Sequence, residues 1–216
     1  MRTPLLLWLC LAWGAAGAQA PRPIDRAVAL YERGDHAGAQ AAFERLSRAG
    51  VAAADYNLGL MHLRRELPRP DLVEGERLLQ RAAQRGFVTA QFALGRLHEE
   101  GAFGGTRDLA AAQRWYLQAA ESGSVDAQVA VGTAHYLGRG APRDLGRAAY
   151  WFREAAKGGD VGAQYLLASM YETGHGLTRD LRQARYWYDI AARNGDEAAP
   201  GKVKQLDAQA GATTPP

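Results

Sequence analysis

The sequence predicts an all-α repeat protein built from pairs of helices, and three observations support this fold class. Apolar side chains recur at helical spacing in each unit, as set out below. Indole side chains return every 36 residues, at Trp115, Trp151 and Trp187. A glycine ends each unit at nearly the same period, at Gly86, Gly123, Gly159 and Gly195. Several columns that share one period of this length indicate a solenoid of stacked supersecondary units.

The first 20 residues have the three parts of a secretory signal peptide. Arg2 provides a basic start, an apolar run extends from Leu5 to Trp13, and an A-x-A cleavage signal ends at Ala20. The apolar run is too short to cross a bilayer as a helix, which takes roughly 20 residues. We therefore expect an exported chain, periplasmic or secreted, with no membrane span after signal cleavage. An uncleaved anchor is the alternative.

Cleavage after residue 20 would also remove Cys10, the only cysteine of the chain. The mature protein would then have no disulfide, no thiolate nucleophile and no cysteine metal ligand. The formal net charge is +3, which indicates no basic face for nucleic acid. The G-x-S-x-G, H-E-x-x-H and G-x-x-x-x-G-K motifs are absent from the sequence. We therefore expect no enzymatic activity, no cofactor and no metal site.

Residues 21–53 contain two short helical patterns, from Ala27 to Asp35 and from Ala39 to Phe43. Together they are similar to a degenerate tetratricopeptide hairpin. We expect this hairpin to cap the N-terminal end of the array.

The first helix of each unit is counted here from position 1, which is Ala54, Ala90, Ala127 or Ala163. Positions 1, 5 and 8 form an apolar stripe at helical spacing. Position 6 is occupied by Gly59, Gly95, Gly132 and Ala168. Glycine inside a helix costs about 1 kcal/mol relative to alanine. Its recurrence predicts that a neighbouring helix comes too close at this point for a larger side chain.

The second helix of each unit is expected to start at an aspartate, namely Asp71, Asp108, Asp144 or Asp180. Aspartate is a good N-cap because its carboxylate accepts bonds from free backbone N–H groups. Trp lies seven residues later in three units, and we expect it to fill the space between repeats. On that expectation Trp151→Ala should destabilise the protein by about 3–5 kcal/mol. The arginines that precede three of the aspartates, Arg107, Arg143 and Arg179, are expected to be solvated or to form ion pairs between repeats.

The last unit contains, in order, Ala163-Gln164-Tyr165, Tyr171, Gly174-x-Gly176, Asp180, Trp187-Tyr188, Ala191-Ala192 and Gly195. This order resembles the Sel1-like repeat, a relative of the tetratricopeptide repeat. The resemblance gives four units, at residues 54–89, 90–126, 127–162 and 163–198. It implies a right-handed α/α superhelix and a role in scaffolding protein complexes. Residues 199–216 would add a short capping helix, Lys202 to Gln209, and a disordered tail from Gly211.

A column of histidines raises the question of a metal site. His62, His98 and His135 share position 9 in the first three units, where the fourth has Tyr171. Adjacent repeats stack at roughly 8–10 Å, whereas zinc needs all its ligands at about 2 Å from one ion. We therefore favour a packing role for this column.

Helix geometry predicts which surface binds a partner. Positions 3, 7 and 10 of the first helix face away from its apolar stripe, and in this class of superhelix the first helices line the concave side. Aromatic side chains with interspersed charge suit a groove for a protein or peptide. The alternative for position 3 is packing against a neighbouring repeat. The candidate binding residues are Tyr56, Leu60, Leu63, Phe92, Arg96, Glu99, Val129, Thr133, Tyr136, Tyr165, Ser169 and Glu172.

Three functional hypotheses follow. The leading one is an exported adaptor that holds a protein or peptide partner on the concave face. The second is a cell-wall-active enzyme or β-lactam binder, since some cysteine-rich Sel1-like proteins are linked to β-lactams; the lack of cysteine in the mature chain weakens it. The third is a scaffold for polysaccharide secretion or envelope assembly. The sequence identifies neither the partner nor the oligomeric state.

Overall fold

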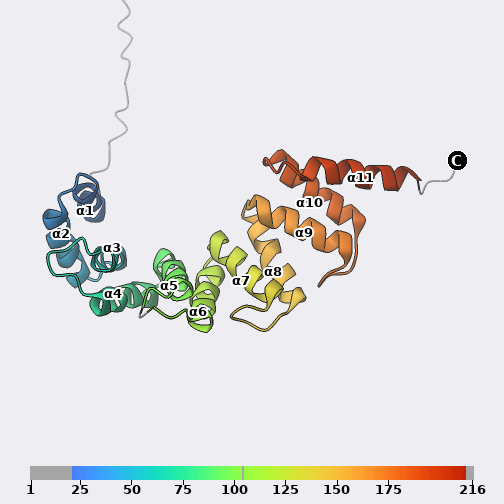
Figure 1. Ribbon diagram of the computed structural model, residues 1–216. Coiled ribbons are helices and arrows are strands. Elements are labelled where there is room, and N and C mark those ends of the chain that lie inside the picture. The colour runs from blue at the N-terminus through green and yellow to red at the C-terminus, as the bar shows by residue number, and fades with distance from the viewer. Residues whose placement is uncertain (1–20, 104, 213–216) are drawn as a thin grey trace, which may run out of the picture.

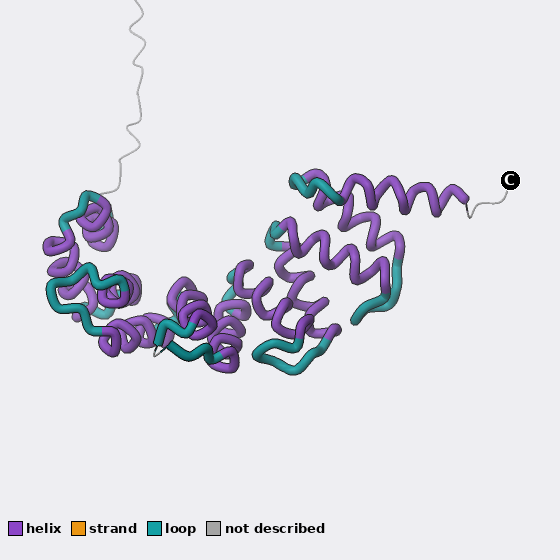
Figure 2. Tube along the Cα trace, viewed as in Figure 1, coloured by secondary structure: helices purple, strands orange, loops and turns teal. Residues whose placement is uncertain are grey.

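A computed structural model describes residues 21–103 and 105–212. The predicted signal peptide, residues 1–20, and residues 213–216 of the predicted tail lie outside the described residues. The described residues form helices and no strand (Figure 2). The helices are α1 (Pro23–Glu32), α2 (His36–Arg48), α3 (Ala52–Leu63), α4 (Leu72–Gln84), α5 (Val88–Glu100), α6 (Leu109–Glu121), α7 (Val125–Leu137), α8 (Leu145–Lys157), α9 (Val161–Thr173), α10 (Leu181–Arg193) and α11 (Ala199–Ala212).

The helices stack in pairs along an arc (Figure 1), which confirms the predicted all-α solenoid. Each helix packs chiefly against the helix before it and the helix after it in the chain. Around the middle of the arc, α3 and α5 lie on its inner side and α4 and α6 on its outer side (Figure 1). No helix of the described residues is long and apolar enough to cross a membrane.

The ends of the helices follow the predicted capping pattern. Each predicted aspartate is the N-cap of its second helix; Asp144, for example, accepts a hydrogen bond from Arg147 N–H at 2.9 Å. Gly138 and Gly174 end α7 and α9 in the left-handed conformation that glycine adopts most readily. Gly176 also lies close to the preceding repeat, since an added Cβ there would be 2.2 Å from the Leu145 carbonyl oxygen.

The glycines at position 6 of the first helices make room for the second helix of the same repeat. A Cβ on Gly95 would lie 2.4 Å from Tyr116 Cδ1, and one on Gly132 would lie 2.9 Å from the Phe152 ring. The close approach predicted from the sequence is therefore confirmed.

Tryptophan packs between repeats, as predicted, but it is not the most buried residue of its helix. Trp115, Trp151 and Trp187 are only partly buried, and each packs against a cluster formed by the second helix of the preceding repeat and the first helix of its own. The buried residue is the next one along the chain, and the column it forms is Leu79, Tyr116, Phe152 and Tyr188. The indole lies at the edge of the helix interface, while the following side chain points into the core of its own repeat.

Buried glutamines join consecutive repeats, and they were not singled out from the sequence. Position 2 of the first helix is a glutamine in three units, and each side-chain amide donates to the carbonyl of the second alanine of the preceding Ala-Ala pair. Gln128 Nε2, for example, lies 3.3 Å from the Ala120 oxygen. In the first unit the same position is Asp55, which is fully buried and forms ion pairs with Arg81 and Arg85.

Two further expectations concern the arginine column and the C-terminal helix. Arg143 and Arg179 are exposed, which agrees with the solvated alternative, and the described residues include no ion pair from either of them to another repeat. Each donates instead to a carbonyl in the last turn of its own repeat's first helix, for example Arg179 Nε to the Glu172 oxygen at 3.0 Å. Helix α11 is also longer than the predicted capping helix, and it includes Gly211 and Ala212, which were assigned to the tail.

Candidate functional site

The predicted binding residues lie on the first helices of the four repeats, α3, α5, α7 and α9, and none of them is fully buried. Arg96, Glu99 and Thr133 are exposed, and the others are partly buried. The structure gathers two groups of them around cavities and leaves the rest outside these cavities.

The first cavity lies between the first helices of repeats 1 and 2, and we call it the α3–α5 cavity. It has a volume of about 340 Å³. Four predicted residues line it: Tyr56, Leu60, Leu63 and Arg96. The other residues of its wall are Arg64, Leu72, Ala93, Leu97, Glu100 and Ala102. The wall is therefore mainly apolar, with arginines and a glutamate among the apolar side chains.

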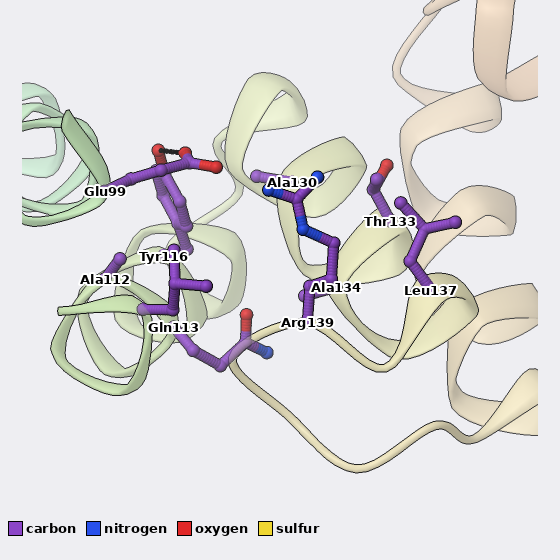
Figure 3. A pocket seen from close by; sticks show the side chains of 10 residues that line it. Glu99, Ala112, Gln113, Tyr116, Ala130, Thr133, Ala134, Leu137 and Arg139 are labelled. Carbon is purple, nitrogen blue, oxygen red and sulfur yellow. Dashed lines mark hydrogen bonds between the residues drawn. The ribbon is translucent and has the colours of Figure 1, made fainter. Parts of the chain in front are cut away.

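The second cavity, the α5–α7 cavity, lies one repeat further along (Figure 3). Its volume is about 170 Å³. Glu99 and Thr133 are the predicted residues in its wall. The others are Leu109, Ala112, Gln113, Tyr116, Ala130, Ala134, Leu137 and Arg139.

The two cavities are the same feature in successive repeats. Leu63, Leu72 and Ala93 of the first cavity correspond, one period later, to Glu99, Leu109 and Ala130 of the second. Arg96 likewise corresponds to Thr133. A partner that spans both cavities would therefore meet equivalent positions with different chemistry: position 10 changes from Leu63 to Glu99, and position 7 changes from Arg96 to Thr133.

The acidic character of the α5–α7 cavity comes from Glu99, which accepts a hydrogen bond from the Tyr116 hydroxyl at 2.7 Å (Figure 3). Burial and the hydrogen bond to Glu99 both raise the pKa of Tyr116 above its ordinary value. The phenol therefore stays protonated at neutral pH and keeps donating to the carboxylate, which it holds in place.

Position 3 of the first helices takes part in internal packing, but the ring contacts lie within one repeat, whereas the alternative to a binding role was packing against the neighbouring repeat. The Phe92 ring lies 5.5 Å from that of Tyr116, and the Tyr165 ring lies 5.0 Å from that of Tyr188. These contacts are with the second helix of the same repeat, and they leave Phe92 and Tyr165 partly exposed.

The remaining predicted residues lie outside the two cavities. The Tyr136 ring lies 6.3 Å from that of Phe152. Ser169 and Glu172 lie on α9 in the last repeat, where Glu172 forms an ion pair with Lys202 of α11. The structure thus places the cavities toward the N-terminal half of the array.

Sequence reasoning missed the cavity residues at positions 4 and 11 of the first helices. At 100° per residue these positions lie about 40–60° around the helix from position 7. Ala93 and Ala130 are at position 4, and Glu100 and Leu137 are at position 11. The repeat period was the signal that could have found them, because both pairs recur in step with the Ala-Gln motif.

The histidine rings contact the loop between the two helices of their own repeat. His62 Nδ1 accepts from Asp71 N–H at 3.1 Å, and His135 Nδ1 lies 3.1 Å from the Pro142 carbonyl oxygen. The His98 ring lies 5.1 Å from that of Phe103. Over residues 21–103 and 105–212, no group of three metal-ligating side chains is brought together.

A family model of the Sel1 repeat matches residues 52–87, 88–124, 125–160 and 161–196. These units begin two residues before those delimited from the sequence, because α3, α5, α7 and α9 start at Ala52, Val88, Val125 and Val161. No curated protein matches the chain significantly.

Solved structures with the same repeat are similar to the chain. One is c5321, a protective antigen of uropathogenic Escherichia coli strains that displays an SLR fold; it is 29% identical over 87% of this chain, with a TM-score of 0.76. The match spans 41% of that protein's chain. Another is a Sel1 repeat protein from Oxalobacter formigenes, 31% identical over 82% of this chain and 75% of that chain, with a TM-score of 0.66.

Proposed function

The chain belongs to the Sel1 repeat family, and on that premise we propose that it is an interaction scaffold that binds a protein or peptide on the concave face of its solenoid. Sel1 repeat proteins are generally protein-interaction scaffolds. The fold is typically not enzymatic, and we propose the same for this chain.

The observation that carries this proposal is the pair of equivalent cavities on successive first helices. Their volumes, about 340 and 170 Å³, suit the entry of individual side chains. Apolar walls with a few polar groups are typical of surfaces that anchor a partner at hot spots. Equivalent cavities in two successive repeats support binding of an extended segment, because such a segment presents side chains at regular intervals along its length.

We also propose that the scaffold acts outside the cytoplasm, in the periplasm or after secretion. The support is the basic, apolar and A-x-A pattern of residues 1–20. Edman sequencing of the protein recovered from a periplasmic fraction would test this, with Pro21 as the expected first residue. A chain that keeps its N-terminus in the membrane fraction would contradict export.

The binding proposal can be tested with a matched pair of double variants that leave the net charge unchanged. Arg96→Ser with Thr133→Arg alters position 7 in both cavities. Arg114→Ser with Gln118→Arg makes the same kinds of change at exposed positions on α6, outside both cavities. We expect the first variant to lose at least tenfold in affinity for a partner of the wild type, and the second to bind normally. Equal binding by both variants would contradict the concave-face site.

A further inference from the structure

At the C-terminal end of the array, Lys202 is bound by a glutamate and lies beside a tyrosine ring. Lys202 Nζ on α11 lies 3.0 Å from both carboxylate oxygens of Glu172. It also lies 5.9 Å from the centroid of the Tyr188 ring, within the range of a cation–π contact. The Tyr188 hydroxyl donates to the same carboxylate at 2.7 Å. Burial acts to raise the pKa of Glu172, but the bonds from Tyr188 and Lys202 bring it below its ordinary value, so the carboxylate is ionised at neutral pH.

The α5–α7 cavity contains the same arrangement without the lysine. Two repeats before Glu172 and Tyr188 are Glu99 and Tyr116, which are also joined by a hydrogen bond of 2.7 Å. Helix α11 packs on α10 as the first helix of a further unit would, and Lys202 is at its position 4. The corresponding residue of α7 is Ala130, whose side chain ends at Cβ, and the cavity of about 170 Å³ lies beside it.

We propose that the α5–α7 cavity receives a lysine side chain of an extended partner peptide. This inference rests on the proposed binding function of the concave face and names the chemistry of its partner. The ammonium would bind Glu99 beside the Tyr116 ring, as Lys202 binds Glu172 beside Tyr188. The methylene stem would pack on Leu109 and Ala134 in the cavity wall.

A second acceptor supports a cationic occupant. Gln113 also lines the cavity, and its Oε1 atom is buried without a hydrogen-bond partner among the described residues. A buried acceptor of this kind gains from a ligand that donates a hydrogen bond. A lysine ammonium is a donor of this kind.

Two cations of this chain act on the proposed site: Arg139 lines the same cavity (Figure 3), and Arg96 is close enough to Glu99 and Tyr116 to interact with both electrostatically. The described residues include no ion pair between either arginine and Glu99, so the carboxylate is left for a ligand. Because Arg139 would repel a second cation, Arg139→Ser should bind lysine peptides at least as tightly as the wild type does.

The neighbouring cavity adds a second feature to the partner. The α3–α5 cavity has Leu63 where the α5–α7 cavity has Glu99. The residue equivalent to Tyr116 is Leu79, which is buried in the core and offers no hydroxyl group. The α3–α5 cavity therefore suits an apolar side chain. A peptide that spans both cavities should therefore carry an apolar residue on one side of the lysine.

One experiment tests the lysine site without any ligand. Ala130→Lys places a lysine where α11 carries Lys202, and Ala93→Lys is the matched control, because its cavity has Leu63 in place of Glu99. We expect Ala130→Lys to melt about 2–4 °C above Ala93→Lys, the shift that one favourable contact gives in a domain of this size. Adding Glu99→Gln should abolish that advantage. Equal melting temperatures, or an advantage that survives Glu99→Gln, would overturn the proposal.

Selection from a phage-displayed library of random heptapeptides provides the second experiment. Binders of the wild-type protein should be enriched in lysine, and replacing that lysine by norleucine, which lacks the ammonium, should weaken binding at least tenfold. Ala130→Lys should block these binders. Binders that need no lysine would overturn the lysine site and leave concave-face binding intact. Binders that are also unaffected by Arg96→Ser with Thr133→Arg would overturn the proposed function itself.

Discussion

Replacing Phe152 by alanine should destabilise the protein more than replacing its neighbour Trp151. Phe152 is 1% exposed, and its ring fills the space above Gly132. Its removal leaves a cavity that the glycine cannot fill, so we expect the usual cost of about 3–5 kcal/mol. Trp151 is only partly buried at the edge of the preceding repeat. Because water can reach the space it leaves, we expect a smaller loss, roughly 1.5–3 kcal/mol.

Urea unfolding followed by circular dichroism at 222 nm measures both losses. Repeat arrays can unfold in parts, so the slope of the transition must match that of the wild type before the midpoints are compared. Phe152→Leu keeps most of the buried volume, and it serves as a milder variant if Phe152→Ala does not fold. A loss for Trp151→Ala that equals or exceeds that for Phe152→Ala would refute the assignment of the core column.

Three further predictions concern single contacts. Asp55→Asn should cost about 1.5–3 kcal/mol at pH 7. Burial acts to raise the pKa of Asp55, but the hydrogen bond from Arg81 brings it below its ordinary value. The stabilisation by the Asp55 carboxylate is therefore present above the ordinary carboxyl pKa of about 3.9 and is lost as the pH falls. Unfolding curves of the variant and the wild type should therefore converge below about pH 4, and a constant gap down to pH 2 would refute this. Asp144→Ala should cost about 1 kcal/mol in urea unfolding through the loss of an N-cap, and no change would mean that the cap contributes nothing. Gly95→Ala should lower the melting temperature although alanine favours helices, because overpacking against Tyr116 costs about 1–3 kcal/mol; a rise would show that the ring moves freely.

The features of the fold that depend on one residue type recurring at the repeat period were predictable from the sequence. Aspartate N-caps and glycine helix ends each depend on one residue and its immediate backbone. The glycines at position 6 reflect a close helix contact, which their recurrence at the repeat period made visible. The identity of the core column was not predictable in the same way. Trp151 and Phe152 are adjacent and both apolar, and a rotation of 100° between them decides which one is buried.

The candidate site was predicted less completely than the fold. Both cavities include residues from the set of positions 3, 7 and 10 of the first helices, and the role of these residues in binding stays a prediction. Their walls also contain residues of the second helices, such as Leu72 and Leu109, whose contribution depends on how successive pairs stack. Lys202 is equivalent to Ala130 because α11 packs on α10 as the first helix of a further repeat would. The sequence pattern did not predict the bounds of α11, so this equivalence could be seen only in the structure.

Site-specific photo-crosslinking in the native cell tests the central claim most directly. A benzophenone amino acid at Thr133 lies at the concave α5–α7 cavity, and one at Gln118 lies at an exposed position on α6. We predict a discrete crosslinked partner from position 133, lost in the Arg96→Ser background, and none from position 118. Crosslinking of the same partner from position 118 alone would contradict binding on the concave face.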